Sequence, residues 1–345
     1  MAALLLVVPA LILGGCDLTG VLSPEEKGEA IAFEASSPLL RDDATNTKSI
    51  KEAFGTGDAF AVFGWHNQAS DNIIFNGTAV TKQAGGSWSY SPVKQWEWDG
   101  SGDYYDFVAV YPYFSNPTRM AVPGNLTVAT SYNLSAATPD EFDLLCATMR
   151  RKGIEDNLKA TVNLQFSHML SAVSVVIEND SDETAFTLTS YCFQHLVVSG
   201  SCRVTLDDDG NPDYVWVDTE RNANLVRETS PASTSLSPDD TYPGDFDLMI
   251  PGALDVASDG SDDPDKMPTL ILNLLYTPTG GVQQTSSIFL SLKDIEDADG
   301  MPITSWERGV KYTYYIAVRL DGGVRVKVVT TQWETIEAET PGILI

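Results

Sequence analysis

The sequence predicts an all-β fold built from antiparallel β-sandwiches, and three of its features lead to this prediction. Short segments alternate between apolar and polar residues, as in residues 312–320, where every second side chain from Tyr312 would face the same side. Clusters of Gly, Pro, Asn and Asp separate these segments at intervals of about ten residues, a spacing typical of sandwiches. Helical periodicity is scarce, and the 43% share of apolar residues is enough for a large core.

The first alternating segment is residues 30–35. Ile31, Phe33 and Ala35 occupy alternate positions, so a strand here would point all three side chains into the sandwich. The next residues, 36–43, contain a proline and are expected to form an exposed loop.

Glycine-rich turns predict two β-hairpins further along the chain. Gly85-Gly86 and Asp321-Gly322-Gly323 each stand between two alternating segments, and glycine tolerates the positive φ that tight hairpin turns require. Aspartate-rich turns are expected at residues 207–212 and 297–300. The segments joined by the two hairpin turns are residues 73–80 with 88–93, and residues 312–320 with 324–328.

The chain of 345 residues is long enough for two medium-sized domains. A fresh run of alternating segments begins after the basic group at residues 150–152. We therefore expect a signal peptide at residues 1–15, an N-terminal sandwich at residues 16–155 and a C-terminal sandwich at residues 156–345.

The N-terminal segment indicates export. Leu4 to Leu13 form an apolar run that is too short to span a bilayer but suits the core of a signal peptide. Gly14-Gly15 and Cys16 come next, and small residues before a cysteine are similar to the lipobox of bacterial lipoproteins, in which the thiol is acylated. Residues 1–3 lack the Lys or Arg that usually opens such a signal, so an apolar end that frays or forms a buried strand stays the alternative.

The acidic composition excludes one class of partner. With 21 basic and 48 acidic residues the formal net charge is −27, whereas nucleic acid requires a basic face. The same charge disfavours peripheral binding to anionic lipid, so membrane attachment is expected through lipid on Cys16. We interpret the acid excess as a solubility feature of an exported protein.

Beyond Cys16 the chain carries Cys146, Cys192 and Cys202, and this odd number rules out a fully paired set of disulfides. Cys192 and Cys202 could face each other across a hairpin. Buried free thiols are the alternative.

A series of short motifs rich in aromatic and aliphatic residues extends over residues 30–335. They are W-S-Y-S-P-V-K-Q-W at residues 88–96, Y-P at residues 111–112, D-L-L-C-A-T at residues 143–148, V-N-L-Q-F-S-H-M-L-S at residues 162–171, D-L-M-I-P at residues 247–251, W-E-R-G-V-K-Y-T-Y at residues 306–314 and Q-W-E at residues 332–334. In order and spacing this series resembles the fimbrillin-like lipoproteins of Bacteroidales, a family of pilus subunits and their anchor and tip relatives. Gln332 and Cys146 depart from the family pattern, which commonly has an acidic and an aromatic residue there.

The resemblance implies two transthyretin-like β-sandwich domains in tandem and export as a lipoprotein to the outer membrane and cell surface. For polymerising members it also implies that an arginine-specific protease removes the N-terminal segment, and that the terminal strand of a neighbouring subunit fills the vacated groove. Arg41 is the only basic residue between Lys27 and Lys48, so it is the expected cleavage site.

The apolar residues Ile343, Leu344 and Ile345 are the candidate donor strand. The alternative is a terminal strand that packs on its own domain.

The function expected from these features is that of a fimbrial subunit, or an anchor or tip component, that is joined to copies of itself or to sister subunits by strand exchange and mediates adhesion. No enzymatic activity, metal or cofactor is expected. The three histidines form no recognisable catalytic motif, and His168, within an alternating strand, is expected to be structural. Carboxylate clusters such as residues 259–265 lack the pattern of a calcium-binding loop and are expected to be solvated turns.

The alternative function is that of a surface lipoprotein that binds a host glycan or protein without polymerising. Trp88, Trp96 and Trp98 would be candidates for stacking on sugars in that case. Packing in the core is the preferred interpretation of these side chains.

Overall fold

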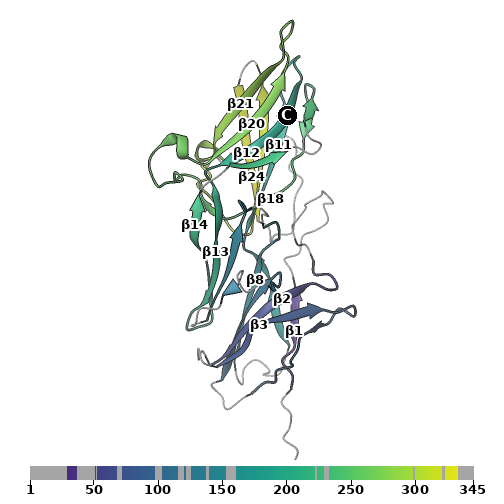
Figure 1. The fold of residues 1–345 in the computed structure, drawn as a ribbon, viewed down its shortest axis with the longest axis vertical. Helices are drawn as coiled ribbons and strands as arrows, with labels where there is room; N and C mark the ends of the chain where they lie inside the picture. The colour runs from purple at the N-terminus through teal and green to yellow at the C-terminus, as the bar shows by residue number, and fades with distance from the viewer. Residues whose placement is uncertain are drawn as a thin grey trace, which may run out of the picture.

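The computed structural model of the chain is an elongated all-β molecule (Figure 1). It describes residues 29–36, 51, 53–67, 72–97, 103–115, 120–121, 126–136, 140–152, 161–221, 224–228, 233–297, 300–320 and 323–332. Apart from two short 3₁₀ helices, η1 (Pro264–Lys266) and η2 (Leu292–Asp294), the regular elements of these ranges are strands. The predicted all-β fold is confirmed.

Six strands form one sheet, here called the central sheet, in the lower half of Figure 1. In order across the sheet they are β10 (Ser167–His168), β8 (Leu145–Lys152), β5 (Tyr104–Tyr111), β2 (Ala59–His66), β3 (Ile73–Lys82) and β4 (Trp88–Ser89). The neighbouring strands are antiparallel, and β3 and β4 form the hairpin predicted around Gly85-Gly86.

The central sheet is buried on both faces. Along β2, Phe60 and Val62 face one hydrophobic core, whereas Ala61, Phe63 and Trp65 face another. In β5 and β8, too, successive side chains face the two cores in turn. Two-sided burial explains why β2 and β5 are almost continuously apolar instead of alternating.

Two different layers cover these faces. On one side lie β1 (Phe33–Ser36) and β9 (Val162–Gln165), which pair in parallel. On the other lies a four-stranded sheet, here called the hairpin sheet, whose residues share a core with the second face. In order, its strands are β14 (Pro212–Arg221), β13 (Val197–Leu206), β7 (Thr127–Asn133) and β6 (Met120–Ala121).

The hairpin sheet joins distant parts of the sequence. β7 pairs with β13 from Thr127↔Thr205 to Asn133↔Ser199, so segments from before and after residue 155 share one sheet. The domain boundary expected near residue 155 stays a prediction. The turn predicted at residues 207–212 is confirmed, because it connects β13 to β14.

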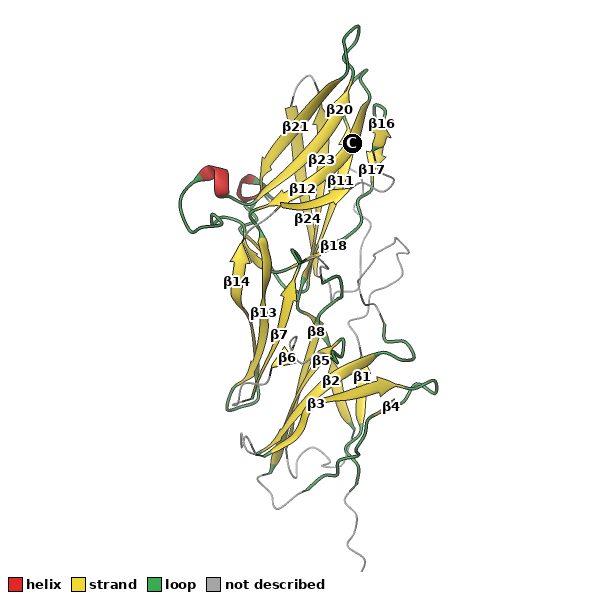
Figure 2. Ribbon diagram, in the orientation of Figure 1, coloured by secondary structure: helices red, strands yellow, loops and turns green. Residues whose placement is uncertain are grey.

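Two further sheets face each other in the upper half of the molecule (Figure 2). One consists of β17 (Thr241–Tyr242), β18 (Asp247–Met249), β11 (Ser171–Asn179), β23 (Val310–Arg319) and β24 (Gly323–Gln332). The other consists of β15 (Asn224–Glu228), β16 (Thr234–Leu236), β12 (Phe186–Gln194), β20 (Thr269–Tyr276) and β21 (Gln284–Ser291). A short pair, β19 (Gly252–Ala253) and β22 (Ser305–Trp306), completes the fold.

The hairpin predicted around residues 321–323 is confirmed. β23 and β24 are antiparallel over ten residue pairs, from Val310↔Gln332 to Arg319↔Gly323. β23 buries its alternate side chains, among them Tyr314 and Ile316, and on its other edge it pairs in parallel with β11.

The cysteines do not form the disulfide considered for Cys192 and Cys202. Cys146, Cys192 and Cys202 are buried thiols that form no disulfide. Cys202, on β13, faces the core between the hairpin sheet and the central sheet. In this core, a hydrogen bond with the Cys202 thiol and burial together raise the pKa of the Cys146 thiol well above its usual value.

A buried ion pair fastens the hairpin sheet to the central sheet. The carboxylate of Asp106 is fully buried and accepts two hydrogen bonds from Arg150, from Nε at 2.7 Å and from Nη2 at 2.9 Å. Nη1 of Arg150 donates to the backbone oxygen of Asp208 in the β13–β14 turn, at 2.7 Å. Gly210 in this turn has a φ of 84°, and a Cβ there would collide with the guanidinium.

Arg150→Ala is expected to lower the free energy of unfolding by about 3–5 kcal/mol, because it leaves Asp106 as a buried carboxylate without its ion-pair partner. Arg325→Ala is the matched control, since the Arg325 side chain is 77% exposed and its pair with Asp180 should contribute less than about 1 kcal/mol. Denaturant unfolding of both variants measures the difference. Equal losses would contradict a special role for the buried pair.

Candidate functional site

The first strand lies between two segments, residues 94–96 and β9, which together are here called the seat of β1. On one side Ile31 N–H donates to the backbone oxygen of Lys94 at 2.9 Å, and Trp96 N–H donates to that of Glu29 at 3.0 Å. On the other side β1 pairs in parallel with β9, with Phe33 opposite Val162. Among the described strands, β9 has no pairing partner except β1. β1 therefore completes the layer that covers one face of the central sheet.

Side chains of the first strand alternate between core and solvent. Ile31 and Phe33 are 1% and 4% exposed, and Ala35 is half-buried, whereas Ala32 and Glu34 are exposed. The expected inward face of residues 30–35 is thus the face that contacts the core. A strand of this kind contributes a row of apolar side chains to the sandwich while its other face meets water.

An aromatic cluster holds Phe33. Its ring centroid lies 5.4 Å from that of Phe75 and 5.7 Å from those of Tyr90 and Phe107, all in edge-to-face geometry. Such ring pairs add to the free energy gained by burying area. The hydroxyl of Tyr90 also donates to the backbone oxygen of Ile31 at 2.7 Å, and burial raises the pKa of Tyr90.

Two parts of this seat could not be found from the sequence. Tyr90 lies within the W-S-Y-S-P motif, but nothing in that motif indicates a hydrogen bond to residue 31. The alternation of Val162 and Leu164 marks a strand, yet its partner lies far away in the sequence and is parallel to it. Cys16, Arg41 and the residues Ile343, Leu344 and Ile345 lie outside the described residues.

Two of the tryptophans considered for sugar stacking, Trp88 and Trp96, pack in or against the core. Trp96 is 4% exposed and packs edge-on against Tyr105, and Trp88 contacts Phe54 and Phe60. Trp98 lies outside the described residues. The preferred interpretation is confirmed for Trp88 and Trp96.

His66 and His168 have structural surroundings. His168 is fully buried, and its Nδ1 lies 3.0 Å and 2.9 Å from the two carboxylate oxygens of Asp143. Asp143 also accepts a hydrogen bond from the backbone N–H of Lys51, at 2.9 Å. His66 ends β2 and stacks on Tyr105. The expected structural role of His168 is consistent with this position.

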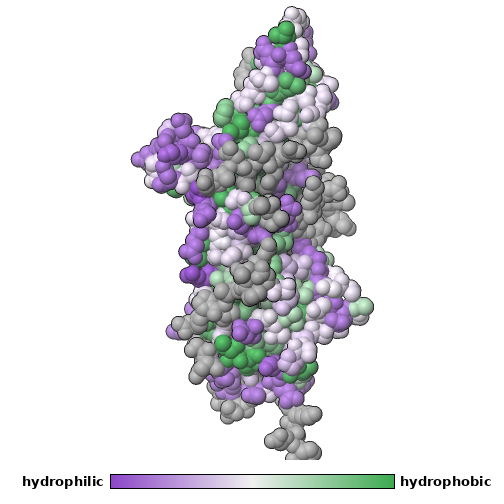
Figure 3. Space-filling model, in the orientation of Figure 1, coloured by the Kyte–Doolittle hydropathy of each residue, from purple (hydrophilic) through white to green (hydrophobic). Residues whose placement is uncertain are grey.

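In two of the carboxylate clusters, at residues 207–212 and 259–265, an aspartate side chain is held by hydrogen bonds within its turn. Lys266 Nζ lies 2.6 Å from Asp259, and this hydrogen bond holds the pKa of the Asp259 carboxyl below its usual range. In the β13–β14 turn, hydrogen bonds from Asn211 lower the pKa of Asp207. The loop that carries η1 projects as a hydrophilic knob (Figure 3).

Within the described ranges, no three His, Cys, Asp or Glu side chains are grouped as a metal would require. No helix of those ranges has the length and apolarity needed to cross a membrane.

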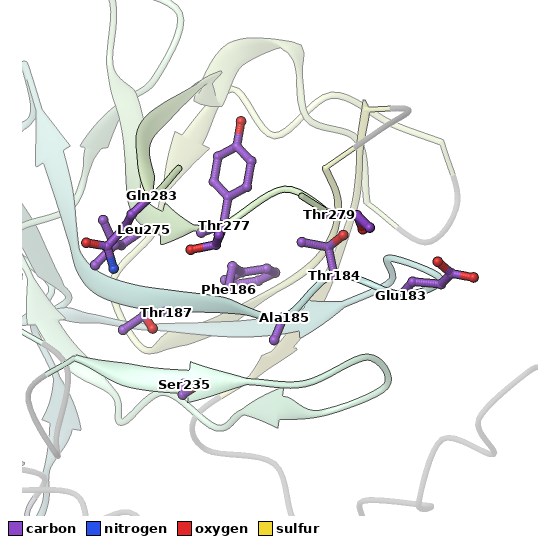
Figure 4. Close-up of a pocket in the computed structure, with 11 residues that line it drawn as sticks. Glu183, Thr184, Ala185, Phe186, Thr187, Ser235, Leu275, Thr277, Thr279 and Gln283 are labelled. Carbon is purple, nitrogen blue, oxygen red and sulfur yellow. The ribbon is translucent and has the colours of Figure 1, made fainter. Parts of the chain in front are cut away.

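The β11–β12 and β20–β21 turns lie at the upper end of the molecule, far from β1 (Figure 1), and they border a polar hollow. Two adjoining cavities of about 290 and 360 Å³ share Glu183, Thr184, Tyr276 and Thr279. Their walls are formed by the turn between β11 and β12, the turn between β20 and β21, and the adjoining ends of β12 and β20 (Figure 4). The lining is mostly polar, with hydroxyl, carboxylate and amide groups around a few apolar side chains.

Phe33→Ala is expected to destabilise the fold by about 3 kcal/mol, because it removes a buried ring from the aromatic cluster and leaves a cavity. Glu34→Ala is the matched control on the exposed face of the same strand and should change the free energy of unfolding by less than about 0.5 kcal/mol. Denaturant unfolding followed by tryptophan fluorescence compares the two. A neutral effect of Phe33→Ala would show that the fold does not need the first strand.

Comparison with solved structures supports the architecture. A protein from Bacteroides uniformis, provisionally named a cell adhesion protein, is similar with a TM-score of 0.51 and 18% identity, over 88% of this chain and 99% of that one. At this identity the likeness concerns the fold alone.

Two other solved structures are similar at lower scores. A protein from Bacteroides ovatus with the same provisional name has a TM-score of 0.49 and 14% identity, over 90% of this chain and 99% of that one. The tip fimbrial protein Mfa3 from Porphyromonas gingivalis has a TM-score of 0.39 and 12% identity, over 81% of this chain and 95% of that one. No match was found among curated proteins.

The family assignment comes from the sequence. A sequence model of the fimbrillin-like family matches residues 44–333, which is most of the chain. The resemblance drawn from the ordered motifs is confirmed, and the chain belongs to the fimbrillin-like family.

Proposed function

We propose that this protein is a fimbrial subunit that is exported as a lipoprotein, cut after Arg41 and joined to its neighbours by donor-strand exchange. Membership of the fimbrillin-like family identifies it as a fimbrial or adhesion-type subunit of the cell surface. Its partners in this proposal are copies of itself or sister subunits. The observation that carries the mechanism is the seat of the first strand.

The position of β1 suits removal by a single cut. β1 ends at Ser36, and Arg41 comes next in the segment expected to be an exposed loop. Hydrolysis after Arg41 would release the first strand together with Cys16 and its lipid. The remaining chain would lose Ile31 and Phe33 from its core.

An empty seat would be unstable. Loss of Ile31 and Phe33 would expose apolar surface worth about 1.5–3 kcal/mol for each side chain. β9 would lose its strand partner, and backbone groups that now bond to residues 29–36 would need new partners. A strand from another chain would restore both the apolar contacts and the backbone pairing.

The candidate donor has the required pattern. Ile343 and Ile345 are two residues apart, as Ile31 and Phe33 are, so an extended segment would place both side chains on one face. Two apolar side chains at this spacing could enter the positions that Ile31 and Phe33 vacate.

The alternative function is that of a surface lipoprotein that binds a host glycan or protein and does not polymerise. The polar hollow at the upper end of the molecule favours a binding role of this kind. The two functions differ in the product of cleavage, because only the first requires oligomers.

An arginine-specific protease is expected to cut the purified full chain first after Arg41, and the product should form a ladder of oligomers that resists detergent. Mass spectrometry of the new N-terminus at Asp42 and gel electrophoresis measure the two steps. Arg41→Ala should abolish this cut and the ladder. Deletion of residues 343–345 should leave the cut and abolish the ladder. Monomers that persist after a clean cut would contradict strand exchange.

Cys16→Ser is expected to abolish incorporation of a labelled fatty acid and to move the expressed protein from the detergent phase to the aqueous phase, because the acylated thiol would be missing. Cys192→Ser is the control and should keep the label. Equal labelling of the two variants would refute lipidation at Cys16.

A further inference from the structure

We propose that the two adjoining cavities at the upper end of the molecule form a binding site for a neutral glycan. The inference rests on the proposed role at the cell surface, but it does not depend on strand exchange. The turn between β11 and β12, residues 180–185, and the turn between β20 and β21, residues 277–283, supply much of the walls, together with the adjoining ends of β12 and β20 (Figure 4).

A buried asparagine holds the first wall in place. Asn179 is fully buried, and its Nδ2 donates to the backbone oxygens of Thr184 at 3.0 Å and Leu236 at 2.9 Å. Its Oδ1 accepts from the backbone N–H of Ser181 at 3.0 Å. Both ends of this solvent-facing turn are therefore tied to one side chain beneath it.

The neighbouring strand β23 reinforces the same wall. Arg319 donates from Nε to the backbone oxygen of Asp180 at 3.1 Å and from Nη2 to the carboxylate of Asp182 at 2.6 Å. The backbone N–H of Leu320 donates to the hydroxyl of Ser181 at 3.1 Å. A turn fixed in this way presents its remaining polar groups in a set geometry, which lowers the entropy lost on binding.

Polar groups that line the cavities are open to a ligand. In the part of the chain that the structure describes, the side chains of Glu183, Thr187, Thr279 and Gln283 make no hydrogen bond or ion pair with the protein. Together they offer a carboxylate and an amide, which can accept hydrogen bonds, and hydroxyls, which can donate or accept. Sugars carry many hydroxyl groups of the same mixed kind, so each of these side chains could find a partner on a saccharide.

Apolar surface accompanies the polar groups. Tyr276 lines both cavities, and its hydroxyl donates to Gln284 at 3.1 Å, which fixes the ring. Val282, in the turn between β20 and β21, is 77% exposed, whereas Phe186 is 1% exposed and belongs to the core behind the lining. Aromatic and aliphatic side chains beside a few fixed polar groups are the usual composition of a small-ligand site. The C–H faces of a sugar ring would pack against Tyr276 and Val282.

Charge and size select the kind of ligand. The carboxylate of Asp182 is paired with Arg319, but Glu183 also borders the hollow and has no ion-pair partner in the described part of the chain. With the net charge of −27, this carboxylate would repel sialylated and sulfated glycans. A protein partner would need about 800 Å² of contact on each side. Concave hollows of a few hundred cubic ångströms instead suit a few sugar rings.

Binding of the purified full chain to an array of neutral, sialylated and sulfated oligosaccharides tests the proposal. We expect binding to neutral members and none to the acidic ones. Glu183→Ala and Thr279→Val should each weaken binding of the best neutral glycan about fivefold to tenfold, because each removes a hydrogen-bonding group. Both positions are exposed, so the fold should be kept. Glu178→Ala, an exposed residue of β11 outside the cavities, is the matched control and should bind like the parent.

Four results would overturn the proposal. They are an array with no neutral glycan bound above background, binding of acidic glycans alone, equal binding by the parent and by both cavity variants, and variant-sensitive binding of a host-cell protein that survives enzymatic removal of its sugars. The cleavage assay on the same preparation separates this proposal from the first. A protein that binds neutral glycans but stays monomeric after the Arg41 cut would keep the glycan site and refute polymerisation.

Discussion

Burial of the central sheet on both faces is the constraint on which the rest of the lower half depends. β2 and β5 carry apolar side chains at successive positions, so neither face of these strands could meet water without a large loss of hydrophobic free energy. The chain must therefore supply two covers. One is the layer of β1 and β9, and the other is the hairpin sheet.

The two covers are held in very different ways. β13 and β14 are ten-residue strands joined by a short turn, and Arg150 ties that turn to Asp106 of the central sheet. β1 has four residues and is a separate segment before the sheet that it covers. Its removal would break few backbone hydrogen bonds but would uncover an aromatic cluster. A covering strand with few backbone hydrogen bonds but many apolar contacts is suited to exchange, because an incoming strand can regain the same contacts.

Sequence reasoning succeeded where the determining interactions are local. The β23–β24 hairpin and the β13–β14 turn result from alternation and turn residues within about twenty positions, and both are present. The parallel pairing of β1 with β9 and the pairing of β7 with β13 join segments far apart in the chain, and alternation alone carries no information about such partners. Cys192 and Cys202 illustrate the same limit. Nearness in sequence suggested a pair, but the thiol beside Cys202 is that of Cys146 in another sheet. At the upper hollow, the polar residues of the two turns carry no distinctive motif, and only the folded turns bring them together.

The two proposed activities use different parts of the molecule, and β24 runs from near one of them toward the middle of the fold. β24 begins at Gly323, opposite Arg319, close to the turn that walls the upper hollow, which Leu320 also lines. It ends at Gln332, which pairs with Val310 at the start of β23. This end lies near the start of β11, because the N–H of Gly309 donates to the backbone oxygen of Leu170. Ten residues of strand extend for about 30 Å, so the segment that leads to the proposed donor starts well away from the hollow. The seat of β1 lies in the opposite half of the molecule (Figure 1). Strand exchange at the seat therefore need not occupy the hollow, and one subunit could be held in a fibre while its upper turns contact a sugar.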